Sequence, residues 1–327
     1  MDNTSQLRLE YIDLCKIFAM FLVTMAHCAQ KLSGNLYPEM VLSKDLFISF
    51  NMPLFMIASG FVMNLSKIRA TPVVDFITAK FVRLIVPMTT WFIVLYIVMY
   101  PRYVCYWDAY WFLSAMFICF VTIKILSKLI IFDVPLCFTS IIVLTIIPFT
   151  FLERSCFMIP YLFTGYYLRR FISQINIVVV VFLFLVYCLM YYFWDVRYSI
   201  YNSPFFICSI TLDSLFSLVF RFLIGAIGGI ALIGLMRIIV ERVNGKWIKK
   251  VAKYGQYTLV FYTMSFVLNA LLDRLVWRIG YITRPEVLDL VAGSVSLLMM
   301  LMMYFFQKGI ERNKILCLLT GVSYRYN

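Results

Sequence analysis

The chain has 327 residues, of which 63% are hydrophobic and only 14% are charged, and its mean hydropathy is +0.91. A soluble domain is closer to half apolar and a quarter charged, so the composition excludes an ordinary soluble protein. The formal net charge of +13 would indicate nucleic-acid binding only in a soluble chain. In a membrane protein, Lys and Arg gather in cytoplasmic loops and set the orientation. We therefore expect the lipid bilayer as a partner and no nucleic acid.

The first apolar segment, residues 11–30, carries an unusual set of polar side chains: Asp13, Lys16 and His27, the last being the only histidine of the protein. At about 100° per residue, Lys16 and His27 differ by only about 20° around a helix axis, and Asp13 precedes Lys16 by one turn. An ionisable group in hydrocarbon costs about 2.5 kcal/mol or more on insertion scales. Three of them on one face predict that this face meets a water-filled or ligand-filled interior.

Further apolar segments follow along the whole chain, with no soluble domain or Gly/Ser linker between them. A helix of about 20 apolar residues crosses a bilayer. The sequence predicts an all-α, polytopic integral membrane protein with a single domain over residues 1–327. We expect about ten transmembrane helices, at residues 11–30, 46–65, 84–100, 109–126, 134–152, 156–170, 175–194, 215–240, 257–277 and 287–306.

The positive charges are distributed unequally between the two sides of this arrangement. With the N-terminus inside, nineteen Lys and Arg residues fall on the cytoplasmic side and eight on the outside. Because cytoplasmic segments carry the excess of positive charge, we expect both termini in the cytoplasm. The nine cysteines include no C-x-x-C pair, so the sequence predicts neither a disulfide framework nor a metal site.

Three motifs in the first third of the chain carry a family resemblance. Residues 13–16, D-L-C-K, precede His27 by ten intervening residues, similar to D-x-L-R followed at that distance by histidine. Residues 50–61 read F-N-M-P-L-F-M-I-A-S-G-F and resemble F-H-M-P-L-F-F-x-x-S-G-F. Residues 80–87 read K-F-V-R-L-I-V-P and resemble R-x-x-R-L-x-x-P. Together these motifs resemble acyltransferase family 3, membrane enzymes that acylate polysaccharides and other envelope sugars.

Later motifs extend the resemblance over nearly the whole chain. They are W-F-L at residues 111–113, F-T-G-Y at 163–166 and G-Q-Y-T-L-V-F-Y at 255–262. The chain departs from the family pattern at two kinds of position. Lysine stands for the commoner arginine at residues 16 and 80, and Asn51 and Met264 stand where histidine is frequent. A lysine offers a point charge in place of the two-pronged guanidinium.

The resemblance implies an O-acyltransferase of the stand-alone form, without an extracytoplasmic esterase-like domain, in the bacterial cytoplasmic (inner) membrane. It implies transfer from acyl-CoA, which we expect to be acetyl-CoA, to a carbohydrate acceptor such as a polysaccharide, an exopolysaccharide or a lipid-linked sugar. Acyl transfer to a hydroxyl needs a base or a transient acyl carrier, and histidine does either near neutral pH. We expect His27 in that role, with Asp13 and Lys16 on the same helix face shaping the cavity. Lys80 and Arg83 would hold the donor phosphates.

Weaker candidates for substrate contact are Asn51, Ser59 and Trp111. Asn51 and Ser59 are eight residues apart and so share roughly one helix face, where small polar residues usually serve helix packing. Lys80 and Arg83 also fit a second interpretation, as positive charges that anchor the topology. The alternative function is a transporter or flippase of a lipid-linked sugar, with the polar face of the first span as its path. Transporters often contain paired repeats, and the sequence contains no convincing pair.

Overall fold

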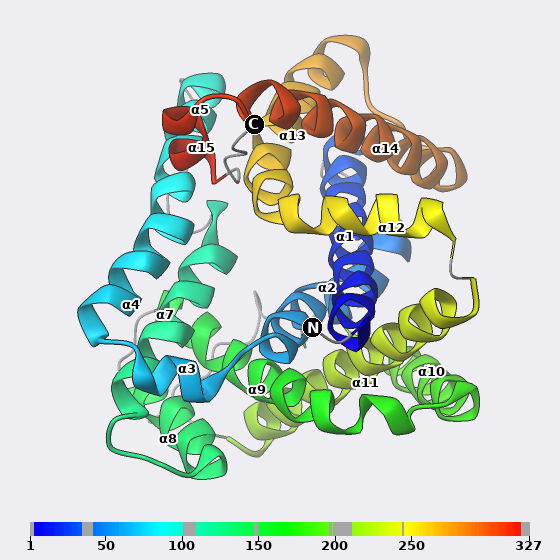
Figure 1. Cartoon of the computed structure of the whole chain (residues 1–327). Coiled ribbons are helices and arrows are strands. Elements are labelled where there is room, and N and C mark those ends of the chain that lie inside the picture. Colours follow the sequence, from blue (N-terminus) through cyan, green and yellow to red (C-terminus); the bar gives the residue numbers. More distant parts are fainter. Residues whose placement is uncertain are drawn as a thin grey trace. The chain divides into compact units, whose positions relative to one another are not determined.

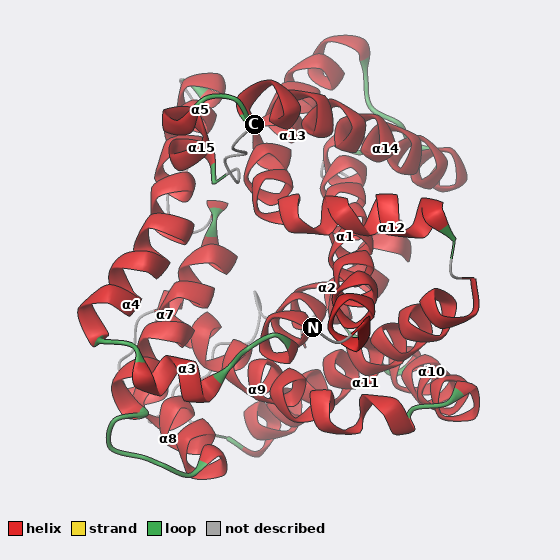
Figure 2. Ribbon diagram, in the orientation of Figure 1, coloured by secondary structure: helices red, strands yellow, loops and turns green. Residues whose placement is uncertain are grey.

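The computed structural model describes residues 3–34, 42–100, 109–146, 150–195, 198, 211–243 and 245–321. Over these residues the chain is helical, with no strand (Figure 2). The all-α expectation is therefore confirmed for the part of the chain that the structure describes.

The helices follow one another along the chain (Figure 1). The α-helices are α1 (Asn3–Leu32), α2 (Leu42–Phe61), α3 (Leu65–Ala70), α4 (Val73–Lys80), α5 (Val86–Met99), α7 (Trp111–Leu126), α8 (Asp133–Ile146), α9 (Thr150–Phe171), α10 (Ile177–Tyr192), α11 (Leu212–Val243), α12 (Lys246–Ala252), α13 (Thr258–Ile279), α14 (Pro285–Ile310) and α15 (Lys314–Thr320). A π-helical turn, η1 (Phe81–Ile85), joins α4 to α5, and 3₁₀ turns follow α9 (η2, Ile172–Gln174) and α12 (η5, Lys253–Tyr257).

Packing divides the chain into two compact units. The first unit comprises Met1–Lys16, Ser49–Lys80 and Trp111–Gly255, and the second comprises Ile17–Ile48, Phe81–Tyr110 and Gln256–Asn327. In the first unit, α7, α8 and α9 pack on one another, and α10 lies along α11 (Figure 1). In the second unit, α13 packs on α5 and α14, and α15 packs on α5. The single domain expected over the whole chain stays a prediction.

Several of the helices are long and apolar enough to cross a membrane. Among the described residues, five helical segments meet this criterion: Glu10–Leu32, Val73–Met99, Leu212–Val243, Lys246–Ile279 and Pro285–Ile310. Shorter apolar helices occur at Ile48–Phe61, Trp111–Leu126, Asp133–Ile146 and Ile177–Tyr192. Apolar helices of this length belong in a bilayer. The number of ten spans and the cytoplasmic location of both termini stay predictions.

Two glycines bring α2 and α9 into backbone contact within the first unit. A Cβ added at Gly60 would lie 1.8 Å from the carbonyl oxygen of Leu162, and one at Gly165 would lie 1.9 Å from that of Ile57. No side chain fits at either position, so each helix uses a glycine where the other's backbone approaches. The glycines of the S-G-F and F-T-G-Y motifs therefore have a packing role in this fold.

The helices at the fifth and sixth expected spans, 134–152 and 156–170, have limits that differ from those of the spans, and the limits of the spans in the membrane stay predictions. Helix α8 ends at Ile146, and α9 begins at Thr150 and continues to Phe171. Hydropathy suggests a boundary at Glu153 and Arg154, but both are good helix formers and continue the helix. The guanidinium carbon of Arg154 lies 5.8 Å from the centre of the Trp111 ring, a position that stabilises a cation beside an apolar surface.

Candidate active site

The acid and the amine of the first motif form an ion pair. Lys16 Nζ donates to Asp13 Oδ1 over 3.0 Å, and the two side chains are 22% and 23% exposed. Their neighbours Ile12 and Cys15 are fully buried. The pair therefore neutralises both charges in an apolar setting while it keeps access to solvent or ligand. Helix α1 is continuous from Asn3 to Leu32. This continuity is what the shared helix face of Asp13, Lys16 and His27 requires.

Asp13 is also the place where the late glycine motif touches the first helix. A Cβ at Gly255 would lie 2.5 Å from both the Cβ and the carbonyl oxygen of Asp13. Only glycine permits this approach. The first residue of the 255–262 motif thus packs against the acid of the first motif, a contact between segments more than 240 residues apart in the sequence.

His27 lies in the second unit among aromatic side chains. Its ring centre is 5.1 Å from that of Phe266 on α13, with the planes tilted by 53°. Phe266 lies in turn 5.1 Å from Tyr110 and 5.3 Å from Tyr262. Tyr110 is held by a 3.0 Å hydrogen bond from its hydroxyl to the carbonyl oxygen of Thr263. His27 is half-buried and its neighbour Cys28 is fully buried, so the imidazole is packed on an aromatic surface and remains accessible.

The third motif, residues 80–87, includes a π-helical turn. Lys80 is the last residue of α4, and Arg83 lies in the π-helical turn η1. Helix α4, the turn η1 and helix α5 form one helical run, Val73–Met99. Pro87 explains the turn: proline has no N–H for the carbonyl of residue 83 and its ring clashes with that carbonyl. Widening of the preceding turn relieves the clash, and such π turns are frequent at functional sites.

Lys80 and Arg83, the expected donor-binding residues, have different surroundings. The Lys80 ammonium lies 3.6 Å from the centre of the Phe120 ring and 5.6 Å from that of Phe76. These cation–π contacts place it against an aromatic surface of the first unit. Arg83 is exposed. Arg83 is thus the more accessible of the two cations for an anionic group.

The three weaker candidates take part in packing or local hydrogen bonds. Asn51 is 5% exposed and its Oδ1 accepts from the backbone N–H of Met52 over 2.6 Å. Ser59 donates to the carbonyl oxygen of Phe55 over 2.8 Å. Trp111 is 5% exposed. The part of these three side chains in substrate binding stays a prediction.

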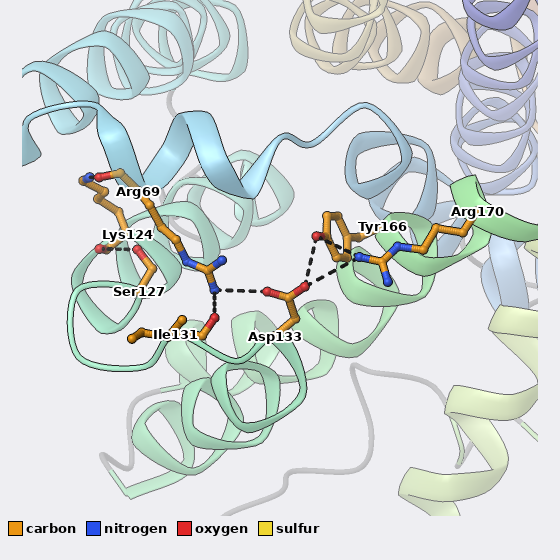
Figure 3. Close-up of polar contacts among 7 residues, drawn as sticks. All are labelled: Arg69, Lys124, Ser127, Ile131, Asp133, Tyr166 and Arg170. Carbon is orange, nitrogen blue, oxygen red and sulfur yellow. Dashed lines mark hydrogen bonds and ion pairs between the residues drawn. The ribbon is translucent and has the colours of Figure 1, made fainter.

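A polar cluster that the sequence analysis missed lies in the first unit (Figure 3). Asp133, at the start of α8, accepts from Arg69 Nη2 and from the Tyr166 hydroxyl, each over 3.0 Å, and lies 3.8 Å from Arg170 Nη2. Arg69 also donates to the carbonyl oxygen of Ile131. One carboxylate therefore joins α3, α8 and α9. The signal available in the sequence was an acid among several basic residues of the expected cytoplasmic segments.

Lys124 belongs to the same region and has a structural role. Its ammonium is fully buried and donates to the carbonyl oxygens of Ile68, Arg69 and Thr71. These carbonyls close the C-terminus of α3, where the last carbonyls have no partner within the helix. The positive charge also suits the negative end of the helix dipole. Elsewhere among the described residues, no group of three or more His, Cys, Asp or Glu side chains is arranged to hold a metal ion.

The fold and these motifs together define an integral membrane protein whose helices carry a polar, partly accessible face. The family model described as an acyltransferase domain matches residues 9–306, which is nearly the whole chain. The chain belongs to acyltransferase family 3 and is a membrane acyltransferase. No significant match to it is found among curated proteins or among solved structures.

Proposed function

We propose that the protein is an O-acetyltransferase of the bacterial inner membrane that moves acetyl from acetyl-CoA to a hydroxyl of an envelope or exported carbohydrate. The observation that carries the proposal is the position of His27. It is the only imidazole in the sequence, and it is half-buried on α1. The same helix carries the Asp13–Lys16 ion pair.

His27 supplies the proton transfer that acyl transfer requires. The acceptor oxygen bonds to the thioester carbonyl carbon, the carbon–sulfur bond breaks, and the hydroxyl proton passes through the imidazole to the departing coenzyme A thiolate. In the second route, the imidazole itself takes the acetyl group from the thioester and then passes it to the acceptor. Both routes need a ring nitrogen with a free lone pair, which no other side chain in this chain supplies near neutral pH.

Asp13, Lys16, Lys80 and Arg83 act through charge. The Asp13–Lys16 pair places a carboxylate and an ammonium on the helix that carries the base, where they shape the polar cavity and balance its charge. Arg83, which is exposed, and Lys80 bind the phosphates of the donor on the cytoplasmic side. A guanidinium forms paired hydrogen bonds with phosphate, whereas an ammonium acts as a point charge. Asn51, Ser59 and Trp111 are kept as weaker acceptor candidates.

The test is acetyl transfer from labelled acetyl-CoA by purified protein in phospholipid nanodiscs. His27→Gln keeps the size and hydrogen bonding of the side chain but not its basicity. General-base assistance contributes roughly 100- to 10,000-fold in rate, so the variant should show no visible transfer and should unfold at the wild-type temperature. Met25→Leu, two residues away on the same helix, is the matched control and should keep full activity.

Two further outcomes separate the alternatives. Labelled protein that accumulates from acetyl-CoA without an acceptor, and not in His27→Gln, assigns the transient acyl-carrier route. A His27→Gln protein that transfers acetyl at the wild-type rate refutes the catalytic assignment. Wild-type protein that transfers no acetyl group but moves a lipid-linked sugar across liposomes would support the transporter instead.

A further inference from the structure

We infer that Phe266 and Asn269 of α13 form an acceptor subsite beside His27, which takes the ring face of a pyranose sugar. The inference rests on the proposed function and deepens it by assigning residues to the acceptor. The structure supports it through the exposure of Phe266, the position of its ring beside His27, and an amide oxygen without a partner on Asn269.

Phe266 is the exception in a buried stretch of helix. From Val260 to Ala270, every residue of α13 is buried except Phe266, which is partly exposed. Exposed apolar residues further along the helix lie on more than one face: Leu271 and Leu275, five and nine residues later, lie about 140° and 180° from Phe266 around the axis, whereas Trp277, three turns later, lies about 20° from it. Phe266 is therefore exposed on a different face of α13 from these two leucines.

Phe266 lies beside the proposed catalytic group. Its ring centre lies 5.1 Å from that of His27, and both side chains are half-buried. Tyr262 and Tyr110 flank the Phe266 ring edge-on, with interplanar angles of 75° and 65°. These contacts hold the ring in one orientation. A ligand that covers Phe266 therefore comes within reach of the imidazole.

Asn269 adds a polar group to the same face. It follows Phe266 by three residues, which puts the two on neighbouring positions of the helix surface. Its side chain is only 4% exposed, and its amide nitrogen donates to the carbonyl oxygen of Ser265 over 2.8 Å. Its Oδ1 is buried and accepts no hydrogen bond. Such an unpartnered acceptor costs about 1–3 kcal/mol, and a hydroxyl donor from a ligand would remove this cost.

These two groups together match the chemistry of a pyranose. An aromatic ring has a negative face, which attracts the weakly positive C–H groups that line one face of a sugar ring. Polar side chains at the edge of an apolar surface then orient the ligand through its hydroxyls. A flexible polyol offers hydroxyls but no rigid C–H face. The subsite should therefore prefer a sugar ring to an open-chain polyol of the same composition.

The first experiment compares Phe266→Leu with wild type in nanodiscs, with methyl α-D-glucopyranoside as acceptor and sorbitol as the open-chain control. Phe266→Leu should raise the KM for the glucoside about five- to tenfold, the effect of one lost aromatic contact. The KM for acetyl-CoA should stay within twofold, and the preference for glucoside over sorbitol should disappear. Phe305→Leu, at an exposed phenylalanine of α14, is the matched control and should change neither. A glucoside KM within twofold of wild type in Phe266→Leu overturns the subsite.

The second experiment measures binding without catalysis. Saturation-transfer NMR of methyl α-D-glucopyranoside should show binding to wild type and loss of signal in Phe266→Leu and Asn269→Leu. Asn269→Leu should also unfold at or above the wild-type temperature, because it removes the unpartnered oxygen; a merely structural asparagine would lower that temperature. Saturable binding without acetyl transfer would leave the subsite standing and refute the acetyltransferase function. No binding of the glucoside to wild type overturns the subsite, whatever the transfer assay shows.

Discussion

Lys16 donates a hydrogen bond to Asp13 over 3.0 Å, one turn apart on α1, and both side chains remain about one-fifth exposed. An ion pair in an apolar helix relieves the cost of two isolated charges. It also means that removal of one partner leaves the other charge alone. Single and double variants of this pair can therefore distinguish a role in charge balance from a role in catalysis.

Asp13→Asn and Lys16→Met should each lower the acetyl-transfer rate about tenfold, the effect of roughly 1.4 kcal/mol on the barrier. Each single variant should also unfold at a lower temperature, because one charge is left without its partner. The double variant should recover stability, since no charge remains, but not activity. Recovery of activity in the double variant would show that the pair is needed only for folding. The measurements are labelled transfer and thermal unfolding in nanodiscs.

The donor site is tested through the cations of the 80–87 motif. Arg83→Ala should weaken acetyl-CoA binding about tenfold, since hydrogen bonds to charged groups are worth about 1.5–3 kcal/mol. Lys80→Ala should have a smaller effect, because its ammonium already lies on the Phe120 ring. The control is the double variant Lys249→Ala/Lys250→Ala on α12, where both lysines are exposed. Unchanged affinity in a Lys80→Ala/Arg83→Ala protein would reduce these residues to topology anchors.

The α2–α9 crossing should not tolerate a side chain. A Cβ at residue 165 would lie 1.9 Å from the Ile57 carbonyl oxygen, so Gly165→Val must separate the helices. Overpacking costs about 1–3 kcal/mol and occasionally more, and here we expect about 3 kcal/mol because backbone cannot rotate away. Gly309→Ala on α14, which would meet nothing within 4 Å, should be neutral or slightly stabilising. Equal melting temperatures for the two variants would contradict the close crossing.

Asp133 should contribute to the stability of the fold, because it contacts two arginines. Asp133→Asn removes the only carboxylate that contacts both Arg69 and Arg170 in Figure 3. Both guanidinium groups then lose the negative charge that they contact, and we expect a loss of roughly 1–3 kcal/mol in the free energy of unfolding. Asp75→Asn, at an exposed acid of α4, is the control. The prediction fails if thermal unfolding places both variants at the wild-type temperature.

The orientation in the membrane is a separate prediction. The excess of Lys and Arg on one side should place both termini in the cytoplasm. A reporter that functions only in the cytoplasm should therefore be active when it is fused to either terminus. A reporter that functions only in the periplasm should be inactive at both. A periplasmic signal from either end would contradict the orientation, and with it the cytoplasmic access of the donor to Arg83.

The sequence predicted which segments form helices more reliably than it predicted where each helix begins and ends. The apolar runs of α10, α11, α13 and α14 lie within a few residues of the expected spans, because hydropathy is a property of each segment alone. The limits of α8 and α9 differ from those of the expected spans because Glu153 and Arg154 lower the hydropathy without breaking the helix. The π-helical turn at Phe81–Ile85 was also missed, although Pro87 is its physical cause.

The candidate site was predictable in part for a similar reason. Helical periodicity alone placed Asp13 one turn from Lys16, and the ion pair follows from that spacing. Periodicity carries no information on the partners of His27, because Phe266 is 239 residues away in the chain and approaches only when α1 and α13 pack. The same holds for Lys80, whose partner Phe120 lies on α7.

The sequence by itself determined the class of this protein, its family and the polar face of α1, since composition, hydropathy and helical spacing all act along the chain. Only the tertiary structure decided which side chains meet: Phe266 against His27, Gly255 against Asp13, and Asp133 between Arg69 and Tyr166. Each of these contacts joins segments distant in sequence. Their positions depend on how helix surfaces fit together, which is a property of packing and not of any one segment.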